Sequence, residues 1–289
     1  MPTVVILGSD GMIGAGVFGA LKESGFNLYG STRRDDHTSK FFLDVMNPDF
    51  ENSLDFLPTG SYLVNCIGLI RHKISEGLEG DAWYLNSDYP NRLAQYALNN
   101  NQKLINICTD CVYSGKNGNY DENSASDPTD IYGETKAAGE ITNSAVMNLR
   151  TSVIGPEAES AVELLSWVLS SAPSSTLKGY TNHLWNGVTS ASLAKIIGGI
   201  IRNNSFEPGI IHLVPANKIS KHDLINEIAI RGNRKDLTIM PFITEIPVDR
   251  TLATVNQTRN RTLWKNAGYD KIPTIQELLS EVLPFSLEG

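Results

Sequence analysis

Cysteine is scarce in this chain of 289 residues, and the three present, Cys66, Cys108 and Cys111, are too few for the disulfide framework of a secreted protein. We therefore expect a cytoplasmic protein. Cys108 and Cys111 form a CxxC pair, but "LINICTDCVYSG" has the pattern of a strand end, which argues against a redox motif or half a zinc site. Because the five histidines also lack metal-ligand spacing, no metal is predicted.

Positive charge and long apolar runs are scarce too. The formal net charge is -8 at pH 7, which excludes a general nucleic-acid binder, since that class relies on a basic face. The apolar run "TVVILG" stops at Gly8 and has no basic leader, so we expect neither a signal peptide nor a membrane span. The remaining composition, 41% hydrophobic and 19% charged, is typical of a globular protein with a sizeable core.

Strand and helix patterns alternate through the first half of the chain. Residues 3–8 form a β-branched run of the kind that is buried on both faces of a parallel sheet. Further strand patterns cover residues 26–31, 40–45, 61–68, 103–110 and 146–155, and helical patterns between them include residues 87–101 and 135–145. The alternation predicts an α/β fold with a doubly wound parallel (Rossmann) sheet.

The rhythm changes after Gly155, where helical patterns separated by Pro and Gly accompany one strand-like segment. We expect residues 1–155 to form an NADP-binding Rossmann domain, to which segments near 187–215 return. Residues 156–186 and 216–289 are expected to form a smaller C-terminal α+β domain that binds the substrate.

Three glycines, Gly8, Gly11 and Gly14, follow the first predicted strand in "GSDGMIG". Glycines at this place let the backbone turn tightly and approach a pyrophosphate, whose charge is met by free N–H groups at the start of the next helix. Such glycines can also serve packing alone, but their position after the first strand of an α/β chain favours a dinucleotide site. Met12 and Ile13 belong to the same turn and are expected to contact the cofactor.

The end of the second predicted strand indicates which dinucleotide binds. Ser31, Arg33 and Arg34 come first in "GSTRRDD", and two guanidiniums suit the 2′-phosphate of NADPH. A solvated basic turn is the alternative, and Asp35 and Asp36 keep NADH possible.

Further cofactor contacts are expected at later strand ends. Asp44, which ends the third predicted strand, can accept a hydrogen bond from the adenine amino group, and Val45 follows it. Cys66, Ile67 and Gly68, in "NCIG", end the fourth predicted strand and complete the set of candidate cofactor contacts.

Tyr132 and Lys136 lie four residues apart in "IYGETKAAGE" and therefore share one face of the predicted helix. A tyrosine phenol has an ordinary pKa of about 10, and a nearby ammonium favours the phenolate and lowers that pKa. The lysine can also hold the ribose of the cofactor. Thr109, at the end of the preceding strand, supplies a hydroxyl that would bind the same substrate oxygen.

The motifs GxxGxxG, "NCIG", "CTDCVYSG", "YGETK" and "LRTSVIG", in this order, resemble those of the extended short-chain dehydrogenase/reductases. The stretch from Thr109 to Glu140 is most similar to the dTDP-4-dehydrorhamnose reductase group, and the likeness covers most of residues 3–215. The resemblance implies that Thr109, Tyr132 and Lys136 act in the reduction of a 4-keto group on a deoxysugar that is attached to a nucleoside diphosphate. NADPH would deliver the hydride and Tyr132 the proton.

The substrate side is defined by fewer signals. By resemblance, Asn86 in "YLNSDYP" shapes the helix beside the site, although it can equally be a helix N-terminal cap. Trp185 would stack on sugar or base, or fill the seam between domains. Arg250 and one residue of "RHK" (71–73) are candidates to clamp the diphosphate, and simple solvation of these cations is the alternative.

Two rival functions are left open. Cys111 stands where bifunctional sugar-nucleotide 3,5-epimerase/4-reductases carry a reactive cysteine, and with His183 it could act on protons next to the ketone. In the alternative interpretation Cys111 is a packed residue and His183 a loop residue, because a thiol with a pKa of about 8.5 needs activation to serve as a base. The second rival is a non-catalytic NADP-binding regulatory protein. A homodimer is also kept open.

Overall fold

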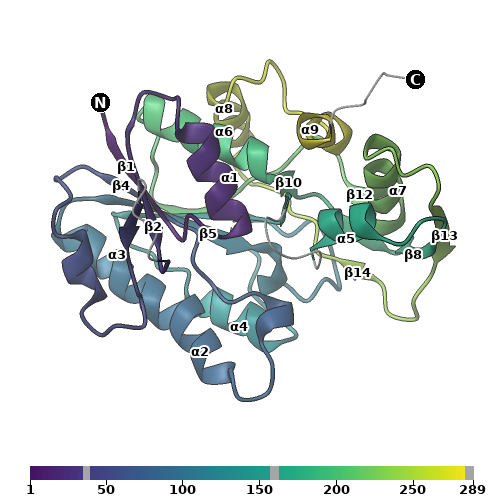
Figure 1. Cartoon of the computed structure of the whole chain (residues 1–289), viewed down its shortest axis with the longest axis horizontal. Coiled ribbons are helices and arrows are strands. Elements are labelled where there is room, and N and C mark those ends of the chain that lie inside the picture. Colours follow the sequence, from purple (N-terminus) through teal and green to yellow (C-terminus); the bar gives the residue numbers. More distant parts are fainter. Residues whose placement is uncertain (35–39, 157–162, 284–289) are drawn as a thin grey trace.

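A seven-stranded, fully parallel sheet forms the centre of the protein (Figure 1). The computed structural model describes residues 1–34, 40–156 and 163–283. The strand order is β11-β6-β5-β4-β1-β2-β3. The strands are β1 (Thr3–Leu7), β2 (Asn27–Thr32), β3 (Lys40–Phe42), β4 (Tyr62–Asn65), β5 (Lys103–Thr109), β6 (Val146–Thr151) and β11 (Gly209–His212). The predicted doubly wound fold is confirmed.

Helices cover both faces of this sheet, as the unbroken apolar run of β1 requires. Val4 and Ile6 pack into one core with α1 (Met12–Leu21) and α6 (Ser190–Arg202). Val5 and Leu7 point the other way, into a second core with α3 (Tyr89–Asn99). Since side chains alternate across a strand, an all-apolar sequence needs such a layer on each side.

The order of the strands reverses beside β1, and this reversal locates the site. After β3 the chain crosses back to β4, which pairs with the free side of β1. In open α/β sheets, ligands bind at the carboxyl ends of the strands next to such a reversal. Here those ends carry the glycine turn after β1 and residues 66–68 after β4.

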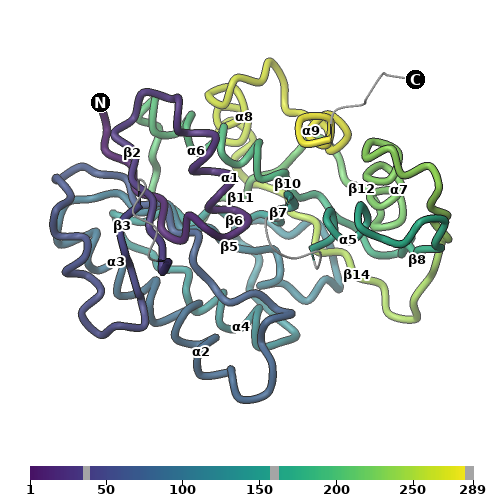
Figure 2. The backbone as a smooth tube through the Cα atoms, in the orientation of Figure 1, coloured from purple at the N-terminus to yellow at the C-terminus, as the bar shows by residue number. Residues whose placement is uncertain are grey.

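A second lobe is built mostly from later segments and lies at the opposite end of the molecule from β3 and α3 (Figure 2). Its core includes Leu165, Leu224, Ile228 and Leu279. Its elements are α5 (Leu164–Ser170), β8 (Thr176–Tyr180), β9 (His183–Trp185), β12 (Ile219–Ser220), α7 (Lys221–Arg231), β13 (Thr238–Phe242), β14 (Val248–Asp249) and α9 (Ile275–Val282). The predicted domain boundaries remain a prediction, which this separate core supports.

The remaining elements connect or cover these two lobes. They are α2 (Glu79–Trp83), a π-helical turn at Tyr84–Asp88, α4 (Ile131–Ala138), α8 (Gln257–Asn266), the paired β7 (Val153–Ile154) and β10 (Val188–Thr189), and 3₁₀ turns at Phe50–Leu54, Arg71–Lys73 and Asp110–Val112. Within the described ranges, no helix has the length and apolar character needed to cross a membrane.

Several predicted elements end earlier than their sequence patterns indicated. The strand expected over residues 146–155 divides into β6, which ends at Thr151, and β7, which pairs with β10. The strand expected to reach residue 68 ends at Asn65, because the Asn65 amide oxygen accepts a hydrogen bond from the Ile67 N–H at 3.1 Å and turns the chain. The strand expected to reach residue 45 ends at Phe42, and Asp44 forms a similar turn with Met46. The helix expected to reach residue 145 ends at Ala138.

Gly139, the first residue after α4, packs against the π-helical turn. Gly139 lies so close to the carbonyl oxygen of Asn86 that a Cβ at this position would overlap it. The chain then leaves the helix and turns toward the sheet, where Asn106 donates a hydrogen bond to the Gly139 carbonyl oxygen at 3.1 Å.

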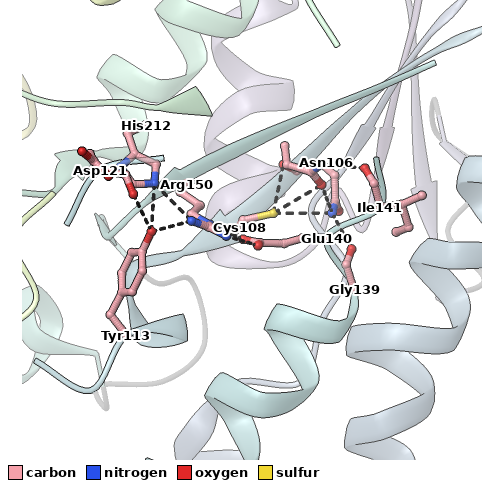
Figure 3. Close-up of polar contacts among 10 residues, drawn as sticks. Asn106, Cys108, Tyr113, Asp121, Gly139, Glu140, Ile141, Arg150 and His212 are labelled. Atoms are coloured by element: carbon pink, nitrogen blue, oxygen red, sulfur yellow. Dashed lines mark hydrogen bonds and ion pairs between the residues drawn. The ribbon is translucent and has the colours of Figure 1, made fainter. Parts of the chain in front are cut away.

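A buried ion pair fastens the chain after α4 to β6 (Figure 3). The Arg150 guanidinium binds both carboxylate oxygens of Glu140, with Nε to Oε1 at 2.6 Å, and each side chain is only 4% exposed. Arg150 Nη1 also donates to the Tyr113 hydroxyl at 2.5 Å and faces His212 Nε2 at 3.3 Å. Because His212 Nδ1 lies 2.8 Å from the Ala253 carbonyl oxygen, which can only accept, Nε2 of the neutral ring is the acceptor.

We predict that Glu140→Ala lowers the free energy of unfolding by about 3–5 kcal/mol, because it leaves the Arg150 charge buried without its partner. Glu51→Ala is the matched control, since Glu51 pairs with Arg92 through two similar bonds but the two side chains are 25% and 35% exposed. That control is expected to cost ~1 kcal/mol or less. Chemical denaturation of both variants measures the difference, and equal losses would contradict a special role for the buried pair.

Candidate active site

Helix α4 presents Tyr132 and Lys136 to a cavity at the carboxyl ends of the strands. The helix begins after Asp130, whose carboxylate accepts a hydrogen bond from the Gly133 N–H at 2.9 Å and so caps the first turn. Tyr132 lies in this capped turn, and Lys136 follows one turn later on the same face. The local sequence therefore fixes the direction of the tyrosine ring at the cavity wall.

Thr109 lines the same cavity from the end of β5, so the structure brings the three predicted catalytic residues together. The Thr109 hydroxyl accepts a hydrogen bond from the Cys111 N–H at 3.1 Å. Lys136 Nζ donates to the carbonyl oxygen of Ile107 at 3.0 Å, and both residues line the cavity.

The pKa of Tyr132 differs from the sequence-based expectation. Burial raises this pKa well above its ordinary value, and the nearby Cys111 and Asp110 raise it further. The Thr109 hydrogen bond and the charge of Arg71 oppose the shift without reversing it. The expected lowering by Lys136 is therefore wrong for this structure. The phenol is protonated at neutral pH, which suits a proton donor.

Five of the residues predicted to contact the cofactor line this cavity: Met12, Ile13, Cys66, Ile67 and Gly68. The nicotinamide half of a dinucleotide would contact them there.

The glycine turn between β1 and α1 is closely packed, because a Cβ on Gly14 would overlap the Gly8 carbonyl oxygen. Gly8 itself has a φ of 78°, which favours glycine, and Gly11 precedes the first residue of α1. A helix start without an acidic residue in its first turn suits a pyrophosphate.

The predicted contacts to the adenosine half lie outside the lining of this cavity. Ser31 is buried, and its hydroxyl accepts a hydrogen bond from the Gly8 N–H at 2.9 Å, so it fastens the glycine turn to β2. Arg33 and Arg34 are exposed at the end of β2. Asp35 and Asp36 lie outside the described residues.

Asp44 and Val45 lie beyond the end of β3 and not within it. Val45 is buried and its carbonyl oxygen accepts a hydrogen bond from the Tyr84 hydroxyl at 2.7 Å. Their contact with adenine remains a prediction.

A second cavity adjoins the first and is rich in cations. The two share Arg71, Asp110, Cys111 and Ser152. Lys178, Lys221 and Arg250 add three more cationic side chains to the second cavity, in a protein of net charge -8. A cation-lined cavity that opens toward Tyr132 suits a substrate with a diphosphate.

Arg250 and Trp185 both line this second cavity, and their contact with substrate remains a prediction. Arg250 Nε donates to the Tyr113 carbonyl oxygen at 2.8 Å, and its Nη2 donates to the Thr129 hydroxyl at 3.5 Å. Trp185 is only 3% exposed, and its indole N–H donates to the Ser152 hydroxyl at 2.8 Å. The burial of Trp185 favours the interpretation that it fills the seam.

Cys111 and His183 line the second cavity, but neither is prepared to act as a strong base there. Burial raises the pKa of the Cys111 thiol to about 11, and Asp110 raises it as well. His183 Nε2 lies 3.0 Å from the Thr244 hydroxyl, and burial lowers the pKa of its ring. Near neutral pH the thiol is protonated and the imidazole is neutral.

Asn86 lies inside the π-helical turn, so the alternative that it caps a helix N-terminus is wrong. Its side-chain amide accepts from the Leu69 N–H at 2.8 Å and donates to the Leu69 carbonyl oxygen at 2.9 Å. It also donates to the Thr135 hydroxyl at 3.1 Å. Asn86 therefore joins the loop after β4 to α4, and π-helical turns often occur at functional sites.

Lys221 and Asp110 are site residues that sequence reasoning missed. Lys221 is the first residue of α7, and the antiparallel pairing of β12 with β9 brings it over the Trp185 ring at 5.3 Å. Burial lowers the pKa of Lys221, while Asp110 acts to raise it. No local pattern indicated this contact between residues far apart in the sequence. Among residues 1–34, 40–156 and 163–283, no cluster of His, Cys, Asp or Glu could hold a metal ion.

Curated relatives match only part of the chain. Methionine adenosyltransferase 2 subunit beta from Bos taurus is 27% identical over 139 residues, which are 47% of this chain and 41% of that protein. The Xenopus tropicalis protein of the same name is 28% identical over 138 residues. The match thus spans less than half the length of these relatives.

Solved structures match over nearly the whole chain. The dTDP-4-dehydrorhamnose reductase from Bacillus anthracis, in complex with NADP, superposes with a TM-score of 0.77 at 19% identity and 98% coverage of both chains. At such identity the likeness concerns the fold. The sequence model described as the RmlD substrate binding domain matches residues 2–284, and the chain therefore belongs to this family.

Proposed function

We propose that this protein is an NAD(P)H-dependent reductase that acts on the 4-keto group of a nucleoside-diphosphate 6-deoxysugar. The observation that carries the proposal is the meeting of two cavities. One holds Thr109, Tyr132 and Lys136 beside the glycine turn, and the other carries the cations. Family membership and the NADP-bound structural relative support the same activity.

The side chains divide the work of the reaction between them. NAD(P)H, when bound, supplies the hydride. Tyr132 holds a proton at neutral pH, since its pKa is raised, and its hydroxyl is the donor for the oxygen that becomes an alkoxide. The Thr109 hydroxyl stabilises the same oxygen by a hydrogen bond, and Lys136 keeps a positive charge close by.

The cations of the second cavity and a structural relative support the proposed substrate class. MoeE5, a structural relative with a TM-score of 0.75 at 17% identity, was solved in complex with UDP-glucose and NAD. A sugar diphosphate between Arg250 and the lysines of the second cavity would direct the sugar toward Tyr132. The three free thiols favour a reducing, cytoplasmic location, and a homodimer stays a prediction.

Two other functions are less well supported. An epimerase/reductase would need an ionised Cys111, and the raised pKa of its thiol opposes this. A regulatory protein is suggested by the partial likeness to methionine adenosyltransferase 2 subunit beta. The complete set of Thr109, Tyr132 and Lys136 around an open cavity favours catalysis. Oxidation of NADPH by dTDP-4-dehydrorhamnose, or by its UDP counterpart, separates an enzyme from a regulator.

We predict that Tyr132→Phe lowers kcat by about 10²–10⁴-fold, because it removes the proton donor while keeping the ring. The dissociation constant of NADPH should stay within about threefold of the wild-type value, since the ring packing is retained. Absorbance at 340 nm and fluorescence titration measure the two quantities. Turnover at the wild-type rate would rule out Tyr132 as the acid.

We predict that Arg250→Ala raises KM for the sugar nucleotide roughly 10–150-fold, the loss expected for a charge-assisted hydrogen bond of about 1.5–3 kcal/mol. Lys271→Ala is the control, because Lys271 is 74% exposed and pairs with Glu277 at 2.9 Å outside the lining of both cavities. An unchanged KM after Arg250→Ala would remove this residue from the substrate site.

We predict that reduction in heavy water introduces no deuterium at C3 or C5 of the sugar, because Cys111 is protonated near neutral pH. Cys111→Ala should retain kcat within about threefold, as for a small packed residue. Mass spectrometry and NMR of the product measure the incorporation. Deuterium at these carbons that disappears in Cys111→Ala would favour the epimerase/reductase instead.

A further inference from the structure

The glycine turn carries an acidic residue, Asp10, beside the end of β2. The turn is fastened there by three bonds, from the Ser9 N–H and the Ser9 hydroxyl to the Ser31 carbonyl oxygen at 3.1 and 2.8 Å, and from the Gly8 N–H to the Ser31 hydroxyl. These contacts leave the Asp10 side chain facing the Thr32 hydroxyl, which donates to it at 2.5 Å.

This place is the one that a doubly wound fold assigns to the 2′-group of the adenosine ribose, between the glycine turn and the end of the second strand. An acidic side chain in that position accepts a hydrogen bond from a 2′-hydroxyl, whereas an arginine or lysine accommodates a 2′-phosphate. The sequence patterns pointed to Ser31, Arg33 and Arg34 for this place, with Asp35 and Asp36 as the acidic alternative.

Asp10 is matched by a lysine from the neighbouring strand. Lys40 begins β3, and its ammonium lies 2.5 Å from Asp10 Oδ1 and 3.5 Å from the Ser9 carbonyl oxygen. The two side chains are 19% and 25% exposed, so solvent screens the pair only in part. Burial acts to raise the pKa of Asp10, but bonds from Lys40 and Thr32 and the charge of Arg34 lower it overall. Asp10 is therefore an anion at neutral pH.

We infer that Asp10 and Lys40 form the adenosine 2′ subsite, in which Asp10 restrains the affinity for NADPH so that NADH also binds. This inference rests on the proposed use of a dinucleotide. A phosphate monoester carries about -1.5 to -2 charges at pH 7, so a neighbouring carboxylate repels it and competes for Lys40. A 2′-hydroxyl instead donates to the carboxylate. The Asp10 carboxylate thus accepts a hydrogen bond from the 2′-hydroxyl of NADH, whereas the Lys40 ammonium binds the 2′-phosphate of NADPH.

Two variants with opposite expected effects test the inference. Asp10→Asn keeps the shape and an acceptor oxygen but removes the charge, and should bind NADPH about tenfold more tightly and NADH about threefold more weakly. Lys40→Met keeps the length of the aliphatic chain, and should weaken NADPH about tenfold while NADH stays within about threefold. Fluorescence titration at fixed ionic strength gives the dissociation constants.

Asp236→Asn is the control for a general change of net charge, because Asp236 pairs with Arg234 in the other lobe. Its ratio of NADPH to NADH affinity should equal that of the wild type. A ratio within twofold of the wild type in both Asp10→Asn and Lys40→Met would overturn the inference. If Asp10→Asn does not fold, Lys40→Met alone decides the matter, and unchanged NADPH binding overturns it.

The titrations need no sugar substrate, so this test and that of the proposed reaction fail independently. If the variants change the ratio of NADPH to NADH affinity but no 4-keto sugar nucleotide is reduced, only the proposed function is contradicted. If a sugar nucleotide is reduced but the variants leave the ratio of NADPH to NADH affinity unchanged, only the inferred 2′ subsite is contradicted.

Discussion

The position of α4 against the carboxyl ends of β5 and β6 is the constraint on which the site depends. Four buried polar side chains hold this helix and the chain that follows it: Asn86 bonds to Thr135, Asn106 to Gly139, Asn148 to Ile141 and Arg150 to Glu140. An unmade bond in such a place is costly, so the contacts specify one position of the helix. Because Tyr132 and Lys136 belong to α4, the same contacts also fix where these two side chains lie.

The same network reaches the second cavity through Tyr113. The Tyr113 hydroxyl bonds to Arg150, and its carbonyl oxygen receives the hydrogen bond from Arg250. The arginine that lines the second cavity and the helix that lines the first are therefore held by one buried cluster, most of which Figure 3 shows. Such a shared support would keep the distance between a diphosphate at Arg250 and the Tyr132 hydroxyl constant.

Local sequence patterns predicted those features that depend on local chemistry. The β-branched strands, the glycine turn and the i, i+4 spacing of Tyr132 and Lys136 were legible because period, turn and helix face follow from neighbouring residues. The helical pattern extended beyond Ala138, where α4 ends and Gly139 packs against the Asn86 carbonyl oxygen. That close approach between distant segments is not visible in the local sequence.

Properties that arise only when distant segments meet could not be predicted in this way. Burial, Cys111 and Asp110 raise the pKa of Tyr132. The sequence-based prediction considered only the nearby Lys136 and therefore expected this pKa to be lowered. Lys221 enters the second cavity only because β12 pairs with β9. Asp10 belongs to the glycine turn, and the sequence of that turn does not indicate a role for an acidic residue. Its role is indicated only by its contacts with Thr32 of β2 and Lys40 of β3 in the folded protein.

A crystal structure of the ternary complex with NADP⁺ and the reduced sugar nucleotide tests the central claim most directly. The account predicts that the C4 oxygen of the sugar lies about 2.6–3.2 Å from both the Tyr132 and the Thr109 hydroxyls, with the diphosphate beside Arg250. A sugar bound elsewhere, or one whose C4 oxygen lies beyond hydrogen-bonding distance of Tyr132, would contradict it.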